Sequence, residues 1–250
     1  MSLIEREDIE GVARVGLENG VTNPISLELV QDLHGLVLEV RDDPTVRALV
    51  ISGNDKFFSI GFDLPTLSKL GKEDLMFFYQ SFNRLSIDLY TMPKPTVAAL
   101  KGHAIAGGCI LALCFDYRFI SEGRKLMGLN EVKLGLPVPY PADNILRQLV
   151  GDRYARDIME EGEFYGPEDC LKMGLVDEVL PKDKVLDRSM EKARQLGEKP
   201  AVAFGVIKQN RVEPVKGRIL ARLEQRELFF LECFFSEGTQ ALVKEAVKKF

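Results

Sequence analysis

The spacing of apolar residues alternates between two periods in the first part of the chain. Between residues 11 and 19 apolar side chains recur at every second position, which predicts a strand. Across 23–43 they recur every three or four positions, which predicts a helix that Ser26 or Asn23 can cap. An apolar run at 46–53 ends at a glycine and predicts a buried strand. Strand, helix and strand in this order are typical of a crossover unit.

The same alternation continues to about residue 130. A second helix is predicted at 72–92, a strand at 94–102, a short buried helix at 107–114 and a strand at 116–121. Strands that alternate with helical segments favour a parallel sheet with helices packed on it. We therefore expect an α/β core with a mostly parallel sheet and helices outside it.

The pattern changes after Glu131, where only 175–181 keeps the character of a strand. Helices are expected at 140–150, 152–161, 167–173, 182–197, 200–210 and 217–247. The last of these should break near Gly238, and it carries four phenylalanines beside a charged face. So much apolar surface near a chain end predicts burial against the core or against a neighbouring subunit.

Composition narrows the class of protein. The chain has 250 residues and a net charge of −5, which does not favour nucleic acid or an anionic membrane as a partner. No apolar run reaches the length of a membrane span, about 18 residues, and the acidic N-terminus has no features of a targeting segment. The four cysteines show neither a CxxC pair nor zinc-ligand spacing with the two histidines. We expect a cytoplasmic protein with reduced thiols, no bound metal, no nucleic-acid partner and no membrane association.

Two glycine-containing segments follow predicted strands. In AIAGGC, Gly107 and Gly108 open the short buried helix, and in FFSIGFDL, Gly61 precedes Phe62. Glycines at a helix start can serve close packing, or they can leave backbone N–H groups free to bind an anion. Both segments lie at the carboxyl ends of strands, where ligands of α/β sheets bind. Two such N–H groups that converge would form an oxyanion hole.

Glu131 is a carboxylate within the largely apolar segment 128–141. It can cap a helix or pair with Lys133. It can also be a general base whose pKa is raised by desolvation. The residues alone leave these alternatives open.

Five other polar or reactive residues are assigned structural roles. His103 and Cys109 are interpreted as packing residues, because neither has an evident partner for a catalytic triad. Asp116 and Arg118 are interpreted as structural ion-pair groups, and Asp63 as the cap of the helix after Phe62.

Taken together, these segments resemble the crotonase, or enoyl-CoA hydratase/isomerase, superfamily. The resemblance covers almost the whole chain and is carried by KFFSIGFDL, PKPTVAALKGHAIAGGC, CFDYRF, GLNEVKLGL and MGLVDEVLP. Within the superfamily, VTNPISLELVQDL, AGGCILALCFDYRF and GLNEVKLGL are especially similar to mitochondrial-type Δ3,Δ2-enoyl-CoA isomerases. The resemblance implies an α/β fold, a crotonase-like spiral of ββα units in 1–190. A helical C-terminal trimerisation region in 191–250 would build a homotrimer or hexamer.

The same resemblance implies an acyl-CoA substrate whose thioester oxygen is held by the backbone N–H groups of Phe62 and Gly107. In hydratases of the superfamily, the position that matches Ile110 is a glutamate, which helps a second glutamate at the position of Glu131 to activate water. Here only Glu131 is an acid. One carboxylate beside an oxyanion hole can still remove an α-proton and return it elsewhere, which is a 1,3-proton shift.

The segment after Glu131 has no second acid up to residue 142, and its prolines make a stiff apolar wall that should exclude water. The acyl group is expected to contact Ile110, Leu136, Val138 and Tyr140. The CoA part is expected to contact Lys56 and Ile60. No cofactor is implied, because CoA enters as part of the substrate.

The predicted function is therefore Δ3,Δ2-enoyl-CoA isomerisation with Glu131 as the single base. Other crotonase chemistries, such as hydration, thioester hydrolysis or C–C cleavage, stay open because fold alone does not choose among them. A catalytically inactive acyl-CoA-binding protein is the alternative from a different class.

Overall fold

A six-stranded sheet forms the centre of the computed structural model, which describes residues 2–248. The strands, in their order across the sheet, are β1 (Ile4–Ile9), β2 (Val12–Leu17), β4 (Ala48–Ser52), β7 (Thr96–Leu100), β9 (Tyr117–Ser121) and β12 (Glu178–Leu180). Only β1 is antiparallel to its neighbour, so the expected mostly parallel sheet is confirmed. The edge strand β1 is the one that apolar spacing did not predict, because its central residues, ERED, are all charged.

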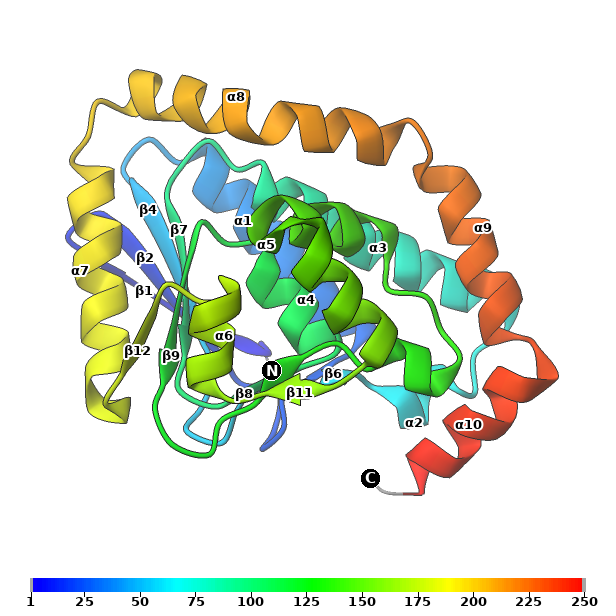
Figure 1. Ribbon diagram of the computed structural model, residues 1–250. Coiled ribbons are helices and arrows are strands. Elements are labelled where there is room, and N and C mark those ends of the chain that lie inside the picture. The colour runs from blue at the N-terminus through cyan, green and yellow to red at the C-terminus, as the bar shows by residue number, and fades with distance from the viewer. Residues whose placement is uncertain (1, 249–250) are drawn as a thin grey trace.

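Helices cover both faces of this sheet (Figure 1). One face packs on α7 (Val185–Gly197) through a small apolar cluster that includes Val50 and Phe119. The opposite face carries the large core, together with α1 (Leu27–Asp42), α3 (Lys72–Tyr90), α4 (Gly107–Leu113) and α5 (Tyr140–Glu161). Helix α5 replaces two expected helices and is interrupted only at Gly151, whose φ is +75°.

Shorter strands bring distant parts of the chain to a common edge. The four strands β11 (Phe164–Tyr165), β10 (Met127–Gly128), β8 (His103–Ile105) and β5 (Phe57–Ser59) form one sheet, and β3 (Pro24–Ile25) pairs with β6 (Gly61–Phe62). Strands β5, β8 and β10 are parallel. Because parallel strands end at the same edge, the segments that follow them, from Ile60, Ala106 and Leu129 onward, meet there.

The last third of the chain consists mainly of helices that wrap around the core (Figure 1). They include α6 (Pro167–Met173), the 3₁₀ helix η2 (Lys182–Lys184), α8 (Ala201–Leu220), α9 (Leu223–Phe234) and α10 (Glu237–Val247). The expected helix at 200–210 continues to Leu220, so the separation predicted between it and a helix at 217–247 is wrong. The expected last helix breaks at 221–222 and again at 235–236, two residues before Gly238. Residues 1, 249 and 250, at the outer ends of the two expected regions, lie outside the described part of the chain.

Buried ionic contacts tie α8 to the sheet. Lys208 Nζ lies 2.7 Å from the carboxylate of Asp116 and donates to the carbonyl oxygen of Lys94 at 3.0 Å. Arg118, equally buried, has its guanidinium 3.6 Å from the carboxylate of Asp177. Burial disfavours the charged form of Lys208 and lowers its pKa, and the carboxylate of Asp116 offsets part of this effect. A buried charge therefore needs a partner of opposite sign. The structural ion-pair roles predicted for Asp116 and Arg118 are therefore confirmed, although the two pair with different partners.

The structure also shows which residues cap α1 and α2 (Leu64–Leu67). Ser26, not Asn23, caps α1, and Asn23 is buried with its amide donating to the carbonyl oxygen of Phe58 at 3.2 Å. Asp63 caps α2 as predicted, accepting from the N–H of Thr66 at 3.3 Å. None of the described helices combines the length and the apolar composition needed to cross a membrane.

Candidate active site

A cavity of about 450 Å³ opens where the short parallel strands end. Its floor is formed by buried residues, namely Gly107, Glu131, Leu136 and Phe230. Its rim is exposed and is formed by Lys133 and by Leu242 and Glu245 of α10. Apart from the carboxyl group of Glu131 the cavity is thus apolar in depth, while charged groups lie at its mouth, and α10 closes one side of it. We call it the site cavity.

The glycine pair at the start of α4 meets two needs. A Cβ at Gly108 would lie 2.3 Å from the carbonyl oxygen of Ser59, so close packing against β5 requires glycine there. A Cβ at Gly107 would lie 3.0 Å from the Phe62 ring. The N–H of Gly107, at the first position of α4, has no partner within the helix. Ala106 before it has φ +49° and ψ −121°, a costly conformation of the kind found at functional sites.

Phe62 brings a second N–H group to the same place. The N–H of Asp63 donates to the carbonyl oxygen of Ile25 at 3.1 Å, so the N–H of Phe62, one residue earlier, points to the other side of the strand. A Cβ on Gly61 would lie 2.9 Å from the nitrogen of Gly107, which shows that the two segments touch. Two N–H groups in this arrangement can stabilise an oxygen that carries negative charge.

Glu131 begins the 3₁₀ helix η1 (Glu131–Leu134), and its side chain is only 6% exposed. Its Oε2 has no hydrogen-bond partner within residues 2–248. Burial raises the pKa of this carboxyl group to about 7, and the backbone N–H groups of Glu131 and Asn130 offset only part of that effect. A carboxyl group that titrates near neutral pH is suited to take up a proton and release it again.

Lys133 is not the partner of this carboxylate. Its Nζ lies 2.7 Å from the carboxylate of Glu163, at the exposed rim of the cavity. The interpretation of Glu131 as a member of an ion pair with Lys133 is therefore wrong. The side chain of Glu131 is instead buried beside the site cavity.

The structure separates the predicted contact residues into two groups. Two of them, Ile60 and Leu136, line the site cavity together with Phe62, Gly107 and Glu131. Four others, Ile110, Val138, Tyr140 and Lys56, are not part of its lining. Ile110 is fully buried one turn after Gly107, and Lys56 is exposed. Their contacts with a substrate stay predictions.

Several lining residues were not anticipated from the sequence, and three of them are informative. Phe230 and Leu242 come from α9 and α10. Asn130 precedes Glu131, and its Oδ1 is buried with no hydrogen-bond partner among the described residues. The apolar residues near the chain end did predict burial of this region. Apolar spacing cannot tell which part of the core a terminal helix will cover.

His103 and Cys109 lie outside this lining. The Nδ1 of His103 accepts from the N–H of Leu126 at 3.0 Å, and its ring packs against Phe57 with centroids 5.1 Å apart. Cys109 is fully buried, and burial raises the pKa of its thiol well above the usual value. Both observations agree with packing roles.

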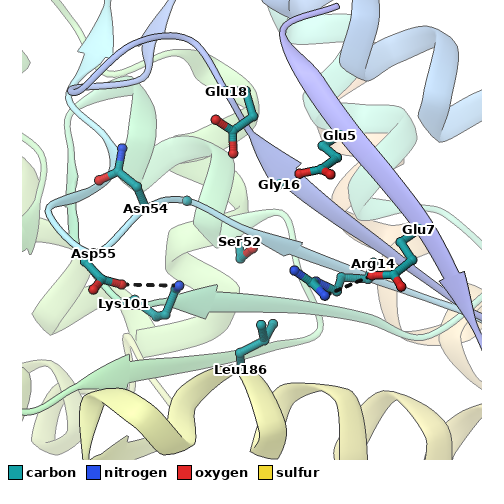
Figure 2. Close-up of a pocket in the computed structure, with 11 residues that line it drawn as sticks. Glu5, Glu7, Arg14, Gly16, Glu18, Ser52, Asn54, Asp55, Lys101 and Leu186 are labelled. Carbon is teal, nitrogen blue, oxygen red and sulfur yellow. Dashed lines mark hydrogen bonds and ion pairs between the residues drawn. The ribbon is translucent and has the colours of Figure 1, made fainter.

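A second cavity, of about 390 Å³, lies over the main sheet and has a different character (Figure 2). Its walls include Glu5, Glu7, Arg14, Asp55 and Lys101. Arg14 pairs with Glu7 at 2.9 Å, and Lys101 pairs with Asp55 at 3.3 Å. Such a charged surface does not suit an apolar ligand, and none of the predicted site residues line it. The site cavity is therefore the candidate active site.

Sequence comparison relates the chain to a known protein family. A family model described as enoyl-CoA hydratase/isomerase matches residues 7–250. The mitochondrial enoyl-CoA delta isomerase 1 of Mus musculus is 32% identical over 185 residues, which cover 73% of this chain but only 64% of that protein. A putative enoyl-CoA hydratase of Thermus thermophilus is 35% identical over 190 residues, 75% of this chain and 74% of that protein.

Solved structures show the same relationship. Human mitochondrial Δ3-Δ2-enoyl-CoA isomerase superimposes with a TM-score of 0.95 at 24% identity, over 99% of this chain and 97% of that one. An enoyl-CoA hydratase from Mycobacterium ulcerans superimposes with a TM-score of 0.84 at 27% identity, over 90% of this chain and 98% of that one. The backbone is thus similar to that of an isomerase and of a hydratase.

Proposed function

Because the chain belongs to the enoyl-CoA hydratase/isomerase family and has its crotonase fold, we propose that it is a Δ3,Δ2-enoyl-CoA isomerase. Its relatives are named for either reaction, so family membership alone does not choose between them. The observation that carries the choice is the single carboxylate at the floor of the site cavity, that of Glu131. The other carboxylate of the described lining, Glu245, lies at the exposed rim and pairs with Lys248 at 2.5 Å.

In the proposed reaction, Glu131 removes a proton from C2 of a 3-enoyl-CoA. The electron pair of the C–H bond moves into the C1–C2 bond, and the thioester oxygen takes the negative charge. The N–H groups of Phe62 and Gly107 stabilise this oxygen, and each donor of this kind contributes about 3 kcal/mol. Glu131 then gives the proton to C4, and the product has its double bond between C2 and C3. Protons and electrons balance within the substrate and Glu131, so the reaction as proposed needs neither a metal ion nor a redox cofactor.

The apolar floor favours isomerisation over hydration. Addition of water needs groups that hold and polarise a water molecule, and the resemblance assigns this task to two glutamates. Ile110 stands at the position of one of them, and Leu136 and Phe230 supply only apolar contacts beside Glu131. A site of this composition supports proton transfer while it keeps water away from the dienolate.

The test is an assay of the purified protein on 3-hexenoyl-CoA and on crotonyl-CoA. We expect rapid conversion of the first substrate and little hydration of the second. Glu131→Gln should lower the isomerase kcat by about 10²–10⁴-fold, because an amide cannot accept the C2 proton. Glu160→Gln, an exposed carboxylate of α5, is the matched control and should keep the wild-type rate.

Two results would contradict the proposal. One is wild-type hydration of crotonyl-CoA at a rate equal to isomerisation, which would indicate a hydratase. The other is an unchanged isomerase rate in Glu131→Gln. Binding of acyl-CoA without turnover of either substrate would indicate the inactive binding protein instead.

A further inference from the structure

An aromatic pair separates the site cavity from another cavity. Phe230 of α9 forms part of the floor of the site cavity. Beyond it lies a cavity of about 550 Å³, here called the far cavity. Its lining includes the charged residues Arg84, Asp88, Lys216 and Glu227 beside Gln80, Ile87, Leu220 and Leu223. Tyr79 of α3 stacks on Phe230 with ring centroids 3.8 Å apart and an interplanar angle of 10°.

The order of contacts along the two helices places this pair between the cavities. Helices α3 and α9 are antiparallel (Figure 1). Lys72, at the start of α3, lies 5.7 Å from the ring of Phe235, just past the end of α9. One turn before Phe230, the carboxylate of Glu227 accepts from the amide of Asn83. Moving along α9 from Leu223 therefore leads from the far cavity, past Phe230, to the site cavity.

The wall between the cavities is held firmly. Tyr79 and Phe230 are each only 2% exposed. Glu227 accepts from Gln80 at 3.1 Å and from Asn83 at 3.0 Å, which clamps α9 against α3 directly beside the stack. Close packing of this kind leaves Phe230 little room to move aside.

We infer that the Tyr79–Phe230 pair is the chain-length stop of the acyl site and that Phe230 determines specificity. This inference rests on the proposed function. The CoA part of the substrate is large and polar, so it stays at the exposed rim, while the thioester oxygen lies at Phe62 and Gly107. The alkyl end then points to the apolar floor. A chain that fills the site cavity meets Phe230, and removal of that ring would extend the apolar floor toward Tyr79, which stacks on it. The charged far cavity does not suit an alkyl chain, so the added length is limited to the space that the ring leaves.

The experiment measures binding of saturated acyl-CoA esters, from butanoyl-CoA to tetradecanoyl-CoA, by isothermal titration calorimetry. Wild-type affinity should rise about fourfold per methylene group up to a certain chain length and then stop rising. In Phe230→Ala this limit should move by at least one two-carbon step, with a roughly tenfold gain for chains beyond the old limit. Phe230→Leu should give an intermediate limit, and it carries the test if the alanine variant does not fold.

Phe77→Ala is the matched control, because Phe77 lies on α3 two residues before Tyr79 but is exposed and lies outside both cavities. Its length limit should equal that of the wild type. The inference is overturned if both Phe230 variants weaken all chains by the same factor, or if the wild type shows no limit across the series. A limit that moves in a protein without isomerase activity would overturn the proposed function but not this inference. Isomerase activity of the wild type together with a length limit that does not move in the Phe230 variants would overturn this inference but not the proposed function.

Discussion

At the scale of single residues, the burial of Glu131 has a consequence for stability as well as for chemistry. The pKa of its carboxyl group is raised from 4.5 to about 7 in the folded chain, mainly by desolvation. Below about pH 4.5 the group is neutral in both the folded and the unfolded state, so its ionisation does not change the free energy of unfolding. As the pH rises through this range, the unfolded chain ionises first, and the folded state is destabilised relative to it. The penalty is complete above about pH 7 and is on the order of 3 kcal/mol.

Glu131→Gln should therefore be more stable than the wild type at about pH 8 and equally stable at about pH 4. The amide keeps the size of the side chain but carries no charge to desolvate. Urea unfolding at the two pH values measures the difference. Glu160→Gln, whose side chain is exposed, should show no such pH-dependent gain. An equal effect of Glu131→Gln at both pH values would contradict the raised pKa.

At the scale of elements, α10 is docked on the 3₁₀ helix that carries Glu131. The hydroxyl of Thr239, near the start of α10, donates to the carbonyl oxygen of Gly135 at 3.0 Å. Gly135 ends η1 with φ +74°, and a Cβ there would lie 2.5 Å from the Thr239 hydroxyl. The contact thus fixes the distance between the two helices, and α10 continues from it along the rim of the site cavity.

Thr239→Val should loosen this contact, because valine has the shape of threonine but no hydroxyl. We expect a loss of about 1 kcal/mol in the free energy of unfolding, since the partly buried hydrogen bond to the carbonyl group of Gly135 is lost. We also expect a several-fold fall in the isomerase kcat, because Glu131 lies at the other end of η1. Thr239→Ser keeps the hydroxyl and should restore the rate. If Thr239→Ser is as slow as Thr239→Val, packing of the methyl group is responsible and not the hydrogen bond.

At the scale of the whole molecule, apolar side chains remain exposed along α8 and α9. They include Val202 at 84% and Ile207 at 70% exposure, together with Leu228 and Phe229. Of the four terminal phenylalanines, Phe230 and Phe234 are buried within their own chain. Only the outer face of these helices therefore lacks a partner. Apolar side chains that stay exposed along two successive helices favour a subunit interface.

We propose that this face joins copies of the chain in a homotrimer or hexamer. Light scattering at micromolar concentration should give about three or six times the chain mass of 28.1 kDa. Ile207→Asp should lower the mass, because it places a charge in an apolar interface. Val21→Asp, at an exposed position outside α8 and α9, is the control and should leave the mass unchanged. A monomeric wild type would contradict the proposed assembly.

The sequence by itself determined the local features of this protein. Apolar spacing within short windows identified five strands of the main sheet and most of the helices, because periodicity reflects which face of an element is buried. It did not predict the two smaller sheets, whose strands of two or three residues are too short to show a period. The position of Glu131 in an apolar segment indicated a raised pKa, and the glycines of AIAGGC indicated a close approach to the backbone. The edge strand β1 was missed because a charged strand with one solvated face carries little apolar signal.

The tertiary structure alone decided which of these features meet. It placed Gly107 against Phe62, paired Lys133 with Glu163 instead of Glu131, and brought Phe230 under the cavity. These residues are far apart in the chain, and their contacts depend on how whole helices pack on two sheets. Periodicity shows that a face is buried but not what covers it. That is why Glu131 and the glycines could be singled out from the sequence as candidates, while the part of Phe230 in the floor and of α10 in the rim could not.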